Sequence, residues 1–430
     1  MLLGARGLAL LRDVVGSGPA REMLCLLETL SSGEGEAGDV ARRVGRLWSG
    51  LAREWGVDGP TPDAWRSYLI LRVLDDENPW SLAAERGEEI SPAIRGQAAR
   101  ELGVLQGLYE IGCAGLLAMV SQVVPELDGL WTPLGDEPTG GSSPRQETAR
   151  WLAEAGDWGG CVAGLEAYFS GHGAGDLGRF RAFRWQDGGL EPVREPDPVS
   201  LSELGGHEEE RGPLLRNTER FLEGLPASHV LVYGQPGTGK SSNVKAVLGA
   251  YADRGLRAVE VAREDLPELP AVLDALRGRG GRFVVFVDDL SFEAEETGYK
   301  ALKALLEGSL QAPPANVLLY ATSNRRNLIR ESFTERDEDV HAQDTAREKL
   351  SLAARFGLRV TFLAPDQKKY LRMVENLADV RGLNLPKEEL YERALAWERR
   401  ISARSGRTAR QFVDELQANL AADTSGDGDP

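Results

Sequence analysis

The feature that most constrains the fold is a glycine-rich turn that joins an apolar run to helix-forming residues. The stretch HVLVYGQPGTGKSSNVKAVL occupies residues 229–248 and contains the pattern G-x-x-x-x-G-K-S. The pattern comprises Gly234, Gln235, Pro236, Gly237, Thr238, Gly239, Lys240 and Ser241. Glycines allow a tight turn whose backbone N–H groups face an anion, and a helix that begins there adds its positive end. The stretch therefore predicts a strand, a phosphate-binding loop and a helix, in that order.

The side chains that close this loop predict which group is bound. Lys240 is the first lysine of the chain, and its ammonium group would pair with the β- and γ-phosphates of a nucleoside triphosphate. Ser241 would offer its hydroxyl to Mg²⁺, and Ser242 follows it among the residues we assign to the nucleotide. We therefore expect ATP and Mg²⁺ as the bound groups.

A buried strand that ends in acids supplies the second half of the predicted site. The run RFVVFVDD places Asp288 and Asp289 at the carboxyl end of an apolar strand, where open α/β sheets bind their ligands. We assign Asp288 to Mg²⁺ and Asp289 to the activation of the attacking water. Glutamate is the usual residue at the second position. The shorter Asp289 would therefore need a water relay, and Glu293 is the alternative base.

Polar residues further along the chain complete the expected constellation. Asn324 follows an apolar run that we expect between the two strands already described, so its amide would hold the lytic water. Arg355 ends a short helix at the domain edge, from which it would reach the nucleotide of a neighbouring subunit. Either Arg407 or Arg410, one turn apart in the last helix, would reach back to the phosphates.

Short apolar runs that alternate with helical segments predict an α/β fold with a five-stranded parallel sheet. The expected strands cover residues 230–233, 258–261, 283–287, 317–322 and 358–362. We expect a mainly helical N-terminal domain over residues 1–190, a linker over 191–200, a nucleotide-binding core over 201–365, a helical lid over 366–421 and a disordered tail over 422–430. The first 15 residues predict one amphipathic helix rather than a signal peptide.

The composition argues against several classes of partner. The 430 residues include 50 basic and 67 acidic side chains, a formal net charge of −17. Residues 1–200 carry 18 basic and 30 acidic side chains, a balance of −12, so repulsion opposes binding to a nucleic acid backbone. No uninterrupted apolar run approaches the roughly 18–20 residues that cross a membrane. The three cysteines show no zinc or disulfide spacing, so we expect a cytoplasmic protein.

Together these motifs resemble the AAA+ superfamily of P-loop ATPases. The stretches GGHEEERGPLLRNTERFL, GTGKSSNVKA, VDDLSFE, YKALKALLEG, ATSNRRNL and EKLSLAARFGL are similar to an uncharacterised bacterial family of that superfamily, domain of unknown function 815, over roughly residues 200–418. The resemblance implies that Asn324 is the sensor-1 residue, Arg355 the arginine finger and Arg407 the sensor-2 residue. It implies a homo-oligomer in which Arg355 acts in trans, a lid over residues 366–421, and an adenine contact within residues 204–208, with His207 as the candidate.

Two stretches depart from the AAA+ pattern. The segment REDLPELP after the second strand is acidic and lacks the aromatic residue of AAA+ unfoldases, which argues against threading a protein through a central pore. The stretch RESFTERDEDVHAQD looks inserted between Asn324 and Arg355, and we interpret it as a solvated loop rather than a metal site at His341.

Two functions from different classes remain open at this point. The first is an Mg-dependent ATPase that couples its nucleotide state to the remodelling or loading of an unknown protein client. The second is an ATP-gated switch or scaffold with negligible turnover, which Asp289 and the missing pore aromatic favour. A small-molecule kinase would share only the phosphate-binding loop, and a DNA-remodelling role rests on superfamily analogy alone.

Overall fold

The computed structural model describes residues 2–33, 36–54, 59–135, 143–292, 299–307, 313–324 and 352–426. The chain divides into two compact units. The first comprises Met1–Arg179 with Gly278–Gly281, and the second comprises Phe180–Arg277 with Arg282–Pro430. Glu293 and the stretch around His341 lie outside the described residues.

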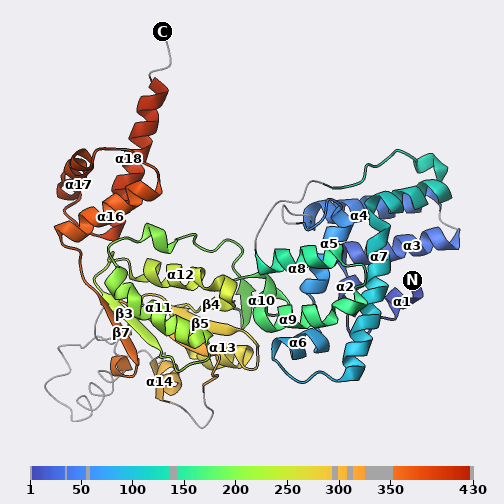
Figure 1. Ribbon diagram of the computed structural model, residues 1–430, viewed down its shortest axis with the longest axis horizontal. Helices are drawn as coiled ribbons and strands as arrows, with labels where there is room; N and C mark the ends of the chain where they lie inside the picture. The colour runs from blue at the N-terminus through green and yellow to red at the C-terminus, as the bar shows by residue number, and fades with distance from the viewer. Residues whose placement is uncertain are drawn as a thin grey trace. The chain divides into compact units, whose positions relative to one another are not determined.

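The first unit is built from helices (Figure 1). They are α1 (Leu2–Arg6), α2 (Arg12–Val15), α3 (Gly18–Ser32), α4 (Ala37–Glu54), α5 (Ala64–Leu74), α6 (Pro79–Glu85), α7 (Pro92–Val123), α8 (Pro144–Glu154), α9 (Val162–His172) and α10 (Asp176–Arg179). Several of its tryptophans are fully buried among these helices, as in Trp65, Trp80 and Trp158. They therefore serve the packing of the unit.

The N-terminal segment forms two short helices, so the prediction of one helix over the first 15 residues is wrong. Between α1 and α2 the backbone N–H groups of Ala9, Leu10 and Leu11 donate to the carboxylate of Glu101 in α7, at 2.8–3.3 Å. Glu101 is buried. A buried carboxylate requires hydrogen bonds, and backbone N–H groups are free to donate only where the chain leaves the helix.

Helix α7 is broken in the middle at Gly112, whose φ of 64° is left-handed. Side chains of α5 and its N-cap satisfy the backbone groups that the break frees. Asp63 accepts from the N–H of Cys113 at 2.7 Å, and Arg66 donates to the carbonyls of Tyr109 and Glu110.

α7 is also the one described helix that is long and apolar enough to cross a membrane, with a mean hydropathy of 1.5. A core helix of a soluble protein passes the same test, so this finding assigns no membrane.

The second unit contains a seven-stranded sheet rather than the five-stranded sheet predicted. The five predicted strands are present as β3 (Val230–Gly234), β4 (Leu256–Glu260), β5 (Arg282–Val287), β6 (Val317–Ser323) and β7 (Leu358–Phe362), all in parallel pairs. The strand order is β2-β1-β4-β5-β6-β3-β7. The prediction that β6 lies between the loop strand β3 and the acidic strand β5 is therefore confirmed.

The two additional strands are a hairpin at the edge of the sheet. β1 (Ala182–Gln186) and β2 (Gly189–Pro192) are antiparallel to each other, and β1 runs parallel to β4. The hairpin turns at Asp187 and Gly188, which both have positive φ, as tight two-residue turns require. The second unit consequently begins at Phe180, within the predicted N-terminal domain, and includes the predicted linker.

Helices cover both faces of the sheet (Figure 1). α11 (Glu208–Leu222) and α12 (Lys240–Ala250) share one hydrophobic core with alternate residues of the central strands, such as Val232, Val284 and Tyr320. α13 (Leu269–Leu276) and α14 (Tyr299–Glu307) contact each other on the other face. Burial on both faces explains why the central strands are continuous apolar runs.

The C-terminal helices, in the region that the sequence predicts as a helical lid, form a separate small core. They are α16 (Gln367–Val380), α17 (Lys387–Ile401) and α18 (Gly406–Gly426). Their shared core includes Tyr370, Val374 and Phe412. α18 continues to Gly426, beyond residue 421, where the sequence predicts that the helical region ends.

Candidate nucleotide-binding site

The glycine-rich loop joins β3 to α12, and its sequence is dictated by close backbone approaches. A side chain at Gly234 would place its Cβ 2.0 Å from the carbonyl oxygen of Phe362, so only glycine fits beside β7. Gly237 and Gly239 have φ values of 79° and 89°, a left-handed region that glycine adopts without strain. Thr238 is buried and donates to the carbonyl of Gln235 at 2.9 Å. The loop therefore has a fixed shape before α12 begins at Lys240.

The ammonium group of Lys240 is held among oxygen acceptors. Its Nζ donates to the carbonyls of Gly234 and Gln235 at 2.9 Å, and to Oδ1 of Asn324 at 2.8 Å. Burial lowers the pKa of Lys240, while the carboxylates of Asp289 and Asp288 act in the opposite direction. The structure thus brings the predicted lysine, the predicted sensor amide and both predicted acids into one cluster.

Asp288 follows β5 and accepts two hydroxyl donors. Ser241 Oγ donates to its Oδ1 at 2.6 Å, and Thr322 Oγ1 donates to the same oxygen. Thr322 lies in β6 and is buried, and its Oγ1 also accepts from the backbone N–H of Asp289 at 2.9 Å. The threonine therefore orients both acids. Sequence reasoning missed it, although it lies two residues before the predicted Asn324.

Asp289 adopts a left-handed backbone, with a φ of 50°. This conformation is uncommon for a residue with a side chain. The N–H of the next residue, Leu290, donates to the carbonyl of Thr322 at 2.7 Å, which ties the turn to β6. The carboxylate of Asp289 accepts from Nδ2 of Asn324. The amide of Asn324 consequently links Lys240 on one side with Asp289 on the other.

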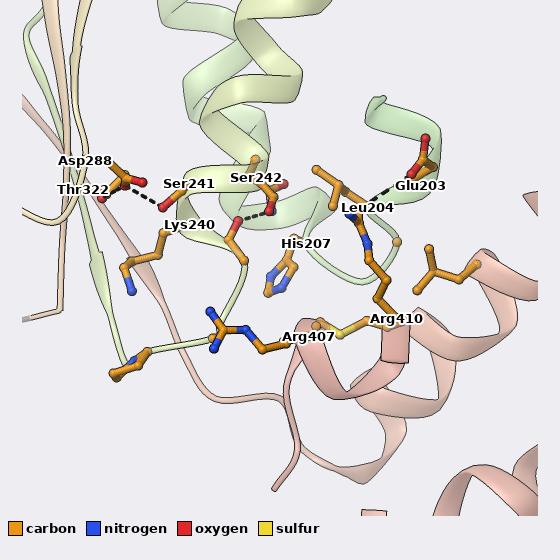
Figure 2. A pocket seen from close by; sticks show the side chains of 18 of the residues that line it. Glu203, Leu204, His207, Lys240, Ser241, Ser242, Asp288, Thr322, Arg407 and Arg410 are labelled. Carbon is orange, nitrogen blue, oxygen red and sulfur yellow. Dashed lines mark hydrogen bonds and ion pairs between the residues drawn. The ribbon is translucent and has the colours of Figure 1, made fainter. Parts of the chain in front are cut away.

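The candidate site opens into a cavity of about 500 Å³ between the sheet and the helical lid (Figure 2). The core contributes the loop, Lys240, Ser241, Asp288, Asp289 and Asn324, and the lid contributes residues of α16 and α18 such as Met373, Leu377, Arg407 and Arg410. Ser242 and His207 also line it. The cavity is large enough for a nucleotide and combines apolar walls with a cluster of charged groups at one end.

The two lid arginines have different surroundings. Arg410 forms an ion pair with Glu203 at 3.6 Å. Arg407 makes no ion pair with the residues that the structure describes, and Figure 2 shows its side chain extending from α18 on the side of the loop and Lys240. The sequence left these two arginines as alternatives for the phosphates, and the geometry favours Arg407.

His207 is the N-cap residue of α11 and its side chain is buried. Its ring lies 4.9 Å from the ring of Phe362, and Nδ1 lies 3.7 Å from a carboxylate oxygen of Glu210. Neither ring nitrogen has a hydrogen-bond partner among the described residues. Burial, together with the nearby charge of Lys369, lowers the pKa of His207 to about 4. The imidazole is therefore neutral at physiological pH, with one ring nitrogen a donor and the other an acceptor.

The lid contacts the core through ion pairs that the sequence did not predict. Three glutamates in or beside the start of α11 face three lid cations. The pairs are Glu203 with Arg410, Glu208 with Arg372 at 3.4 Å, and Glu210 with Lys369. Asn376 also donates to the carbonyl of Ser202 at 2.6 Å. In these pairs the acids belong to the core and the bases to the lid, so this contact is electrostatic and sensitive to salt.

Two sequence predictions lie away from the cavity. Arg355 does not line the cavity of its own chain; its backbone N–H donates to the carbonyl of Leu352 at 3.2 Å. The acidic segment that follows β4 forms a short helix over Arg263–Glu268 and the start of α13. It carries no aromatic side chain, as the sequence shows.

Comparison with known proteins places the chain in a family. A family model described as "Protein of unknown function (DUF815)" matches residues 178–420. No protein with a curated description matches. Among solved structures, the Holliday junction branch migration motor RuvB of Thermotoga maritima is 16% identical, with 51% of this chain and 72% of that chain covered and a TM-score of 0.32. A variant of the same motor is 17% identical, with 51% of this chain and 73% of that chain covered and a TM-score of 0.32.

Neither structural similarity is high enough to transfer an activity or a partner. The family match covers more than half of the chain, and it begins close to the start of the second unit at Phe180 and ends within α18. It therefore includes the hairpin, the loop, both acids and the lid. The chain belongs to the DUF815 family of proteins of unknown function, and its second unit carries the glycine-rich loop between β3 and α12 of a mostly parallel sheet.

Proposed function

We propose that the second unit binds ATP with Mg²⁺ in the cavity between core and lid, and hydrolyses it. The observation that supports this most directly is convergence. Lys240, Asp288 and Asn324 follow three different strands, yet all three line one cavity. A structural role would not require a buried lysine, two carboxylates and an amide to meet where a lid can close over them.

The donor set fits magnesium. Ser241 and Asp288 offer a hydroxyl and a carboxylate joined at 2.6 Å, and Mg²⁺ prefers oxygen ligands, with few of them from protein and the rest from phosphates and water. Among the described residues no group of three or more His, Cys, Asp or Glu is placed to hold a metal without such help. When bound, Mg²⁺ would neutralise charge on the β- and γ-phosphates.

Each residue of the cluster has a role in the proposed reaction. Lys240 would move from the loop carbonyls to the phosphate oxygens, which are stronger acceptors. Asn324 would orient the lytic water, and Asp289 would accept its proton. The water oxygen forms a bond to the γ-phosphorus while the bond from that phosphorus to the β–γ bridging oxygen breaks, which leaves ADP and phosphate. Arg407 would stabilise charge on the phosphates from the lid.

The far end of the cavity suits the base of the nucleotide. Leu204, Gly205 and His207 line it on the core side, and Met373 and Leu377 line it on the lid side. The neutral imidazole of His207 has one donor and one acceptor without hydrogen-bond partners among the described residues. A base between these apolar side chains would satisfy them, so we assign the adenine to this end.

We also propose that the protein acts as a homo-oligomer in which Arg355 reaches the nucleotide of a neighbouring subunit. Its position away from its own cavity supports this arrangement. Nucleotide-driven movement of the lid would then be transmitted to an unknown protein client. An ATP-gated switch with negligible turnover is the second candidate, because Asp289 is short and its carboxylate already accepts from Asn324.

Release of phosphate under steady-state conditions separates the two candidates. An ATPase predicts release that Asp289→Asn reduces by about 100-fold or more without loss of ATP binding. A switch predicts tight ATP binding with phosphate release at the uncatalysed background rate.

A mixture of the Arg355→Ala and Asp289→Asn proteins tests whether two subunits share one site. Recovery of partial activity is expected, and no recovery at any ratio would contradict action in trans.

A further inference from the structure

A second cavity, of about 580 Å³, lies in the second unit and shares no lining residue with the nucleotide cavity. Its floor is the face of β1, β4 and β5. Its wall is the C-terminal half of α12, and its roof is residues 193–202, which follow the hairpin. We refer to it as the strap cleft. Its volume lies within the range of small-molecule sites, which are mostly apolar with a few polar groups.

Small residues line both the floor and the wall of the strap cleft. Ala182 of β1 lies opposite Ala258 of β4 in the parallel ladder, so two alanines share the floor. Gly249 and Ala250 lie on the wall. A Cβ added at Gly249 would meet no atom within 4 Å. Gly249 and Ala250 are exposed, so the cleft is open to solvent and a ligand can enter it.

The charges at the rim distinguish which ligand fits. Lys245 of α12 forms an ion pair with Asp197 of the roof at 3.8 Å, a separation beyond hydrogen-bond distance. Arg181 has no acidic partner among the described residues, whereas Arg184 is paired with Glu260 at 3.1 Å. Of the three basic residues, Lys245 belongs to α12, Arg184 lies in β1 and Arg181 precedes β1. The exposed Glu195 and Asp197 belong to the roof, where each precedes a proline. On α12 and the sheet, three basic residues therefore face one acid, Glu260, whereas the other two acids of the lining lie on the roof.

The cleft is also connected to the nucleotide cavity through the chain. α12, which forms its wall, begins at Lys240 in the phosphate-binding loop. The roof ends at Ser202, and the next two residues, Glu203 and Leu204, line the nucleotide cavity. A ligand that shifts the roof or α12 would move groups that contact the nucleotide.

We propose that the strap cleft binds a small amphipathic anion. Its apolar body would lie against Ala182, Ala258 and Phe286, and its acidic group would pair with Lys245. Binding there is coupled to binding in the nucleotide cavity, and this second part rests on the proposed ATP function. Coupling is reciprocal, so each ligand changes the affinity of the other by the same factor.

The test uses two fluorescent probes of similar shape. One is 8-anilinonaphthalene-1-sulfonate, which carries an anionic group, and the other is the neutral N-phenyl-1-naphthylamine. Saturable binding of one sulfonated molecule per chain is expected. Gly249→Leu fills the cleft and should weaken both probes by about tenfold or more. Lys245→Met should weaken only the sulfonated probe, by about tenfold.

Two further variants accompany this test. Ala114→Leu adds apolar volume to an exposed position of α7 and should change neither affinity. Ala258→Leu fills the same cleft from the floor and serves if Gly249→Leu fails to fold. Undiminished binding to either folded filling variant would overturn the site. Equal weakening of both probes by Lys245→Met, or none, would overturn the preference for an anion.

Titration of MgATP separates this proposal from the proposed function. If the wild-type protein binds the sulfonated probe but no MgATP, the ATP function fails and the cleft remains. If it binds both, saturating MgATP should change the probe affinity severalfold, and saturating probe should change the MgATP affinity by the same factor. Unchanged affinities in both directions would overturn the coupling.

Discussion

Two carboxylates, one in each unit, accept several hydrogen bonds but from different kinds of donor. Glu101 of the helical unit accepts mainly from backbone N–H groups, those of Ala9, Leu10 and Leu11. Asp288 of the α/β unit accepts mainly from hydroxyls, those of Ser241 and Thr322, and from one backbone N–H, that of Asp289 at 3.2 Å. Backbone donors are fixed by the fold, whereas hydroxyls can turn and let the carboxylate bind a cation. The first arrangement stabilises the fold, and the second allows the carboxylate to bind a metal ion.

Removal of the Glu101 carboxylate is expected to have the largest effect on stability. Glu101→Ala should destabilise the helical unit by about 3 kcal/mol, because three backbone N–H groups lose their acceptor. Urea unfolding followed by tryptophan fluorescence reports this unit, since residues 1–179 hold seven of the nine tryptophans. The affinity for MgATP should remain within about twofold. A large loss of affinity together with unchanged stability would reverse the assignment.

Thr322→Val tests the hydroxyls around Asp288. The variant keeps the shape of the buried side chain but removes the donor to Asp288 and the acceptor for the N–H of Asp289. We expect ATP hydrolysis to fall by about 30-fold, or about 2 kcal/mol, with a higher Mg²⁺ requirement. Thr322→Ser retains the hydroxyl and should retain most of the activity. Equal losses in both variants would show that packing, not hydrogen bonding, matters here.

The two lid arginines give the next contrast. Arg407→Ala should weaken MgATP binding by about tenfold, because a charge-assisted contact to phosphate is lost. Arg410→Ala should weaken it by less than about threefold, since Arg410 is paired with Glu203 in a partly exposed position. Calorimetric titration of both variants measures the difference. The reverse ranking would assign the phosphates to Arg410.

The smallest expected effect is a pH dependence of stability. The pKa of His207 is lowered to about 4 from its ordinary value of 6.5. Between these values the unfolded chain binds a proton that the folded chain does not, so stability falls as pH drops from about 6.5 towards 4. His207 accounts for about 1 kcal/mol at pH 5.5. Burial also lowers the pKa of His229, which acts in the same direction. The contribution of His207 is therefore the difference between the wild type and His207→Gln in the slope of unfolding free energy against pH. An unchanged slope would contradict the buried neutral imidazole.

The sequence predicted the parts of the site that depend on local pattern. The loop, the five central strands and the placement of Asp288 follow from apolar runs and from glycines whose spacing has a physical reason. The hairpin at β1 and β2 was missed although Asp187-Gly188 is a turn signal and Phe183 and Trp185 alternate with polar residues, because the predicted domain boundary after residue 190 fell within the hairpin.

Contacts between distant residues were not predictable. Thr322 becomes a partner of Asp288 only when β5 and β6 are adjacent, and a threonine in a strand usually indicates no more than β-propensity. The pair of Lys369 and Glu210 joins residues 159 positions apart. The strap cleft depends on the register of β1 against β4, because only that register places Ala182 beside Ala258.

Calorimetric titration of MgATP into the wild-type protein and into Lys240→Ala tests whether the second unit binds a nucleotide through Lys240. One site per chain is expected in the wild type. The affinity should be at least about 100-fold weaker in the variant, because the buried ammonium group is the main positive charge at the phosphates. No heat on titration of the folded wild-type protein, or equal affinities of the two proteins, would contradict binding through Lys240.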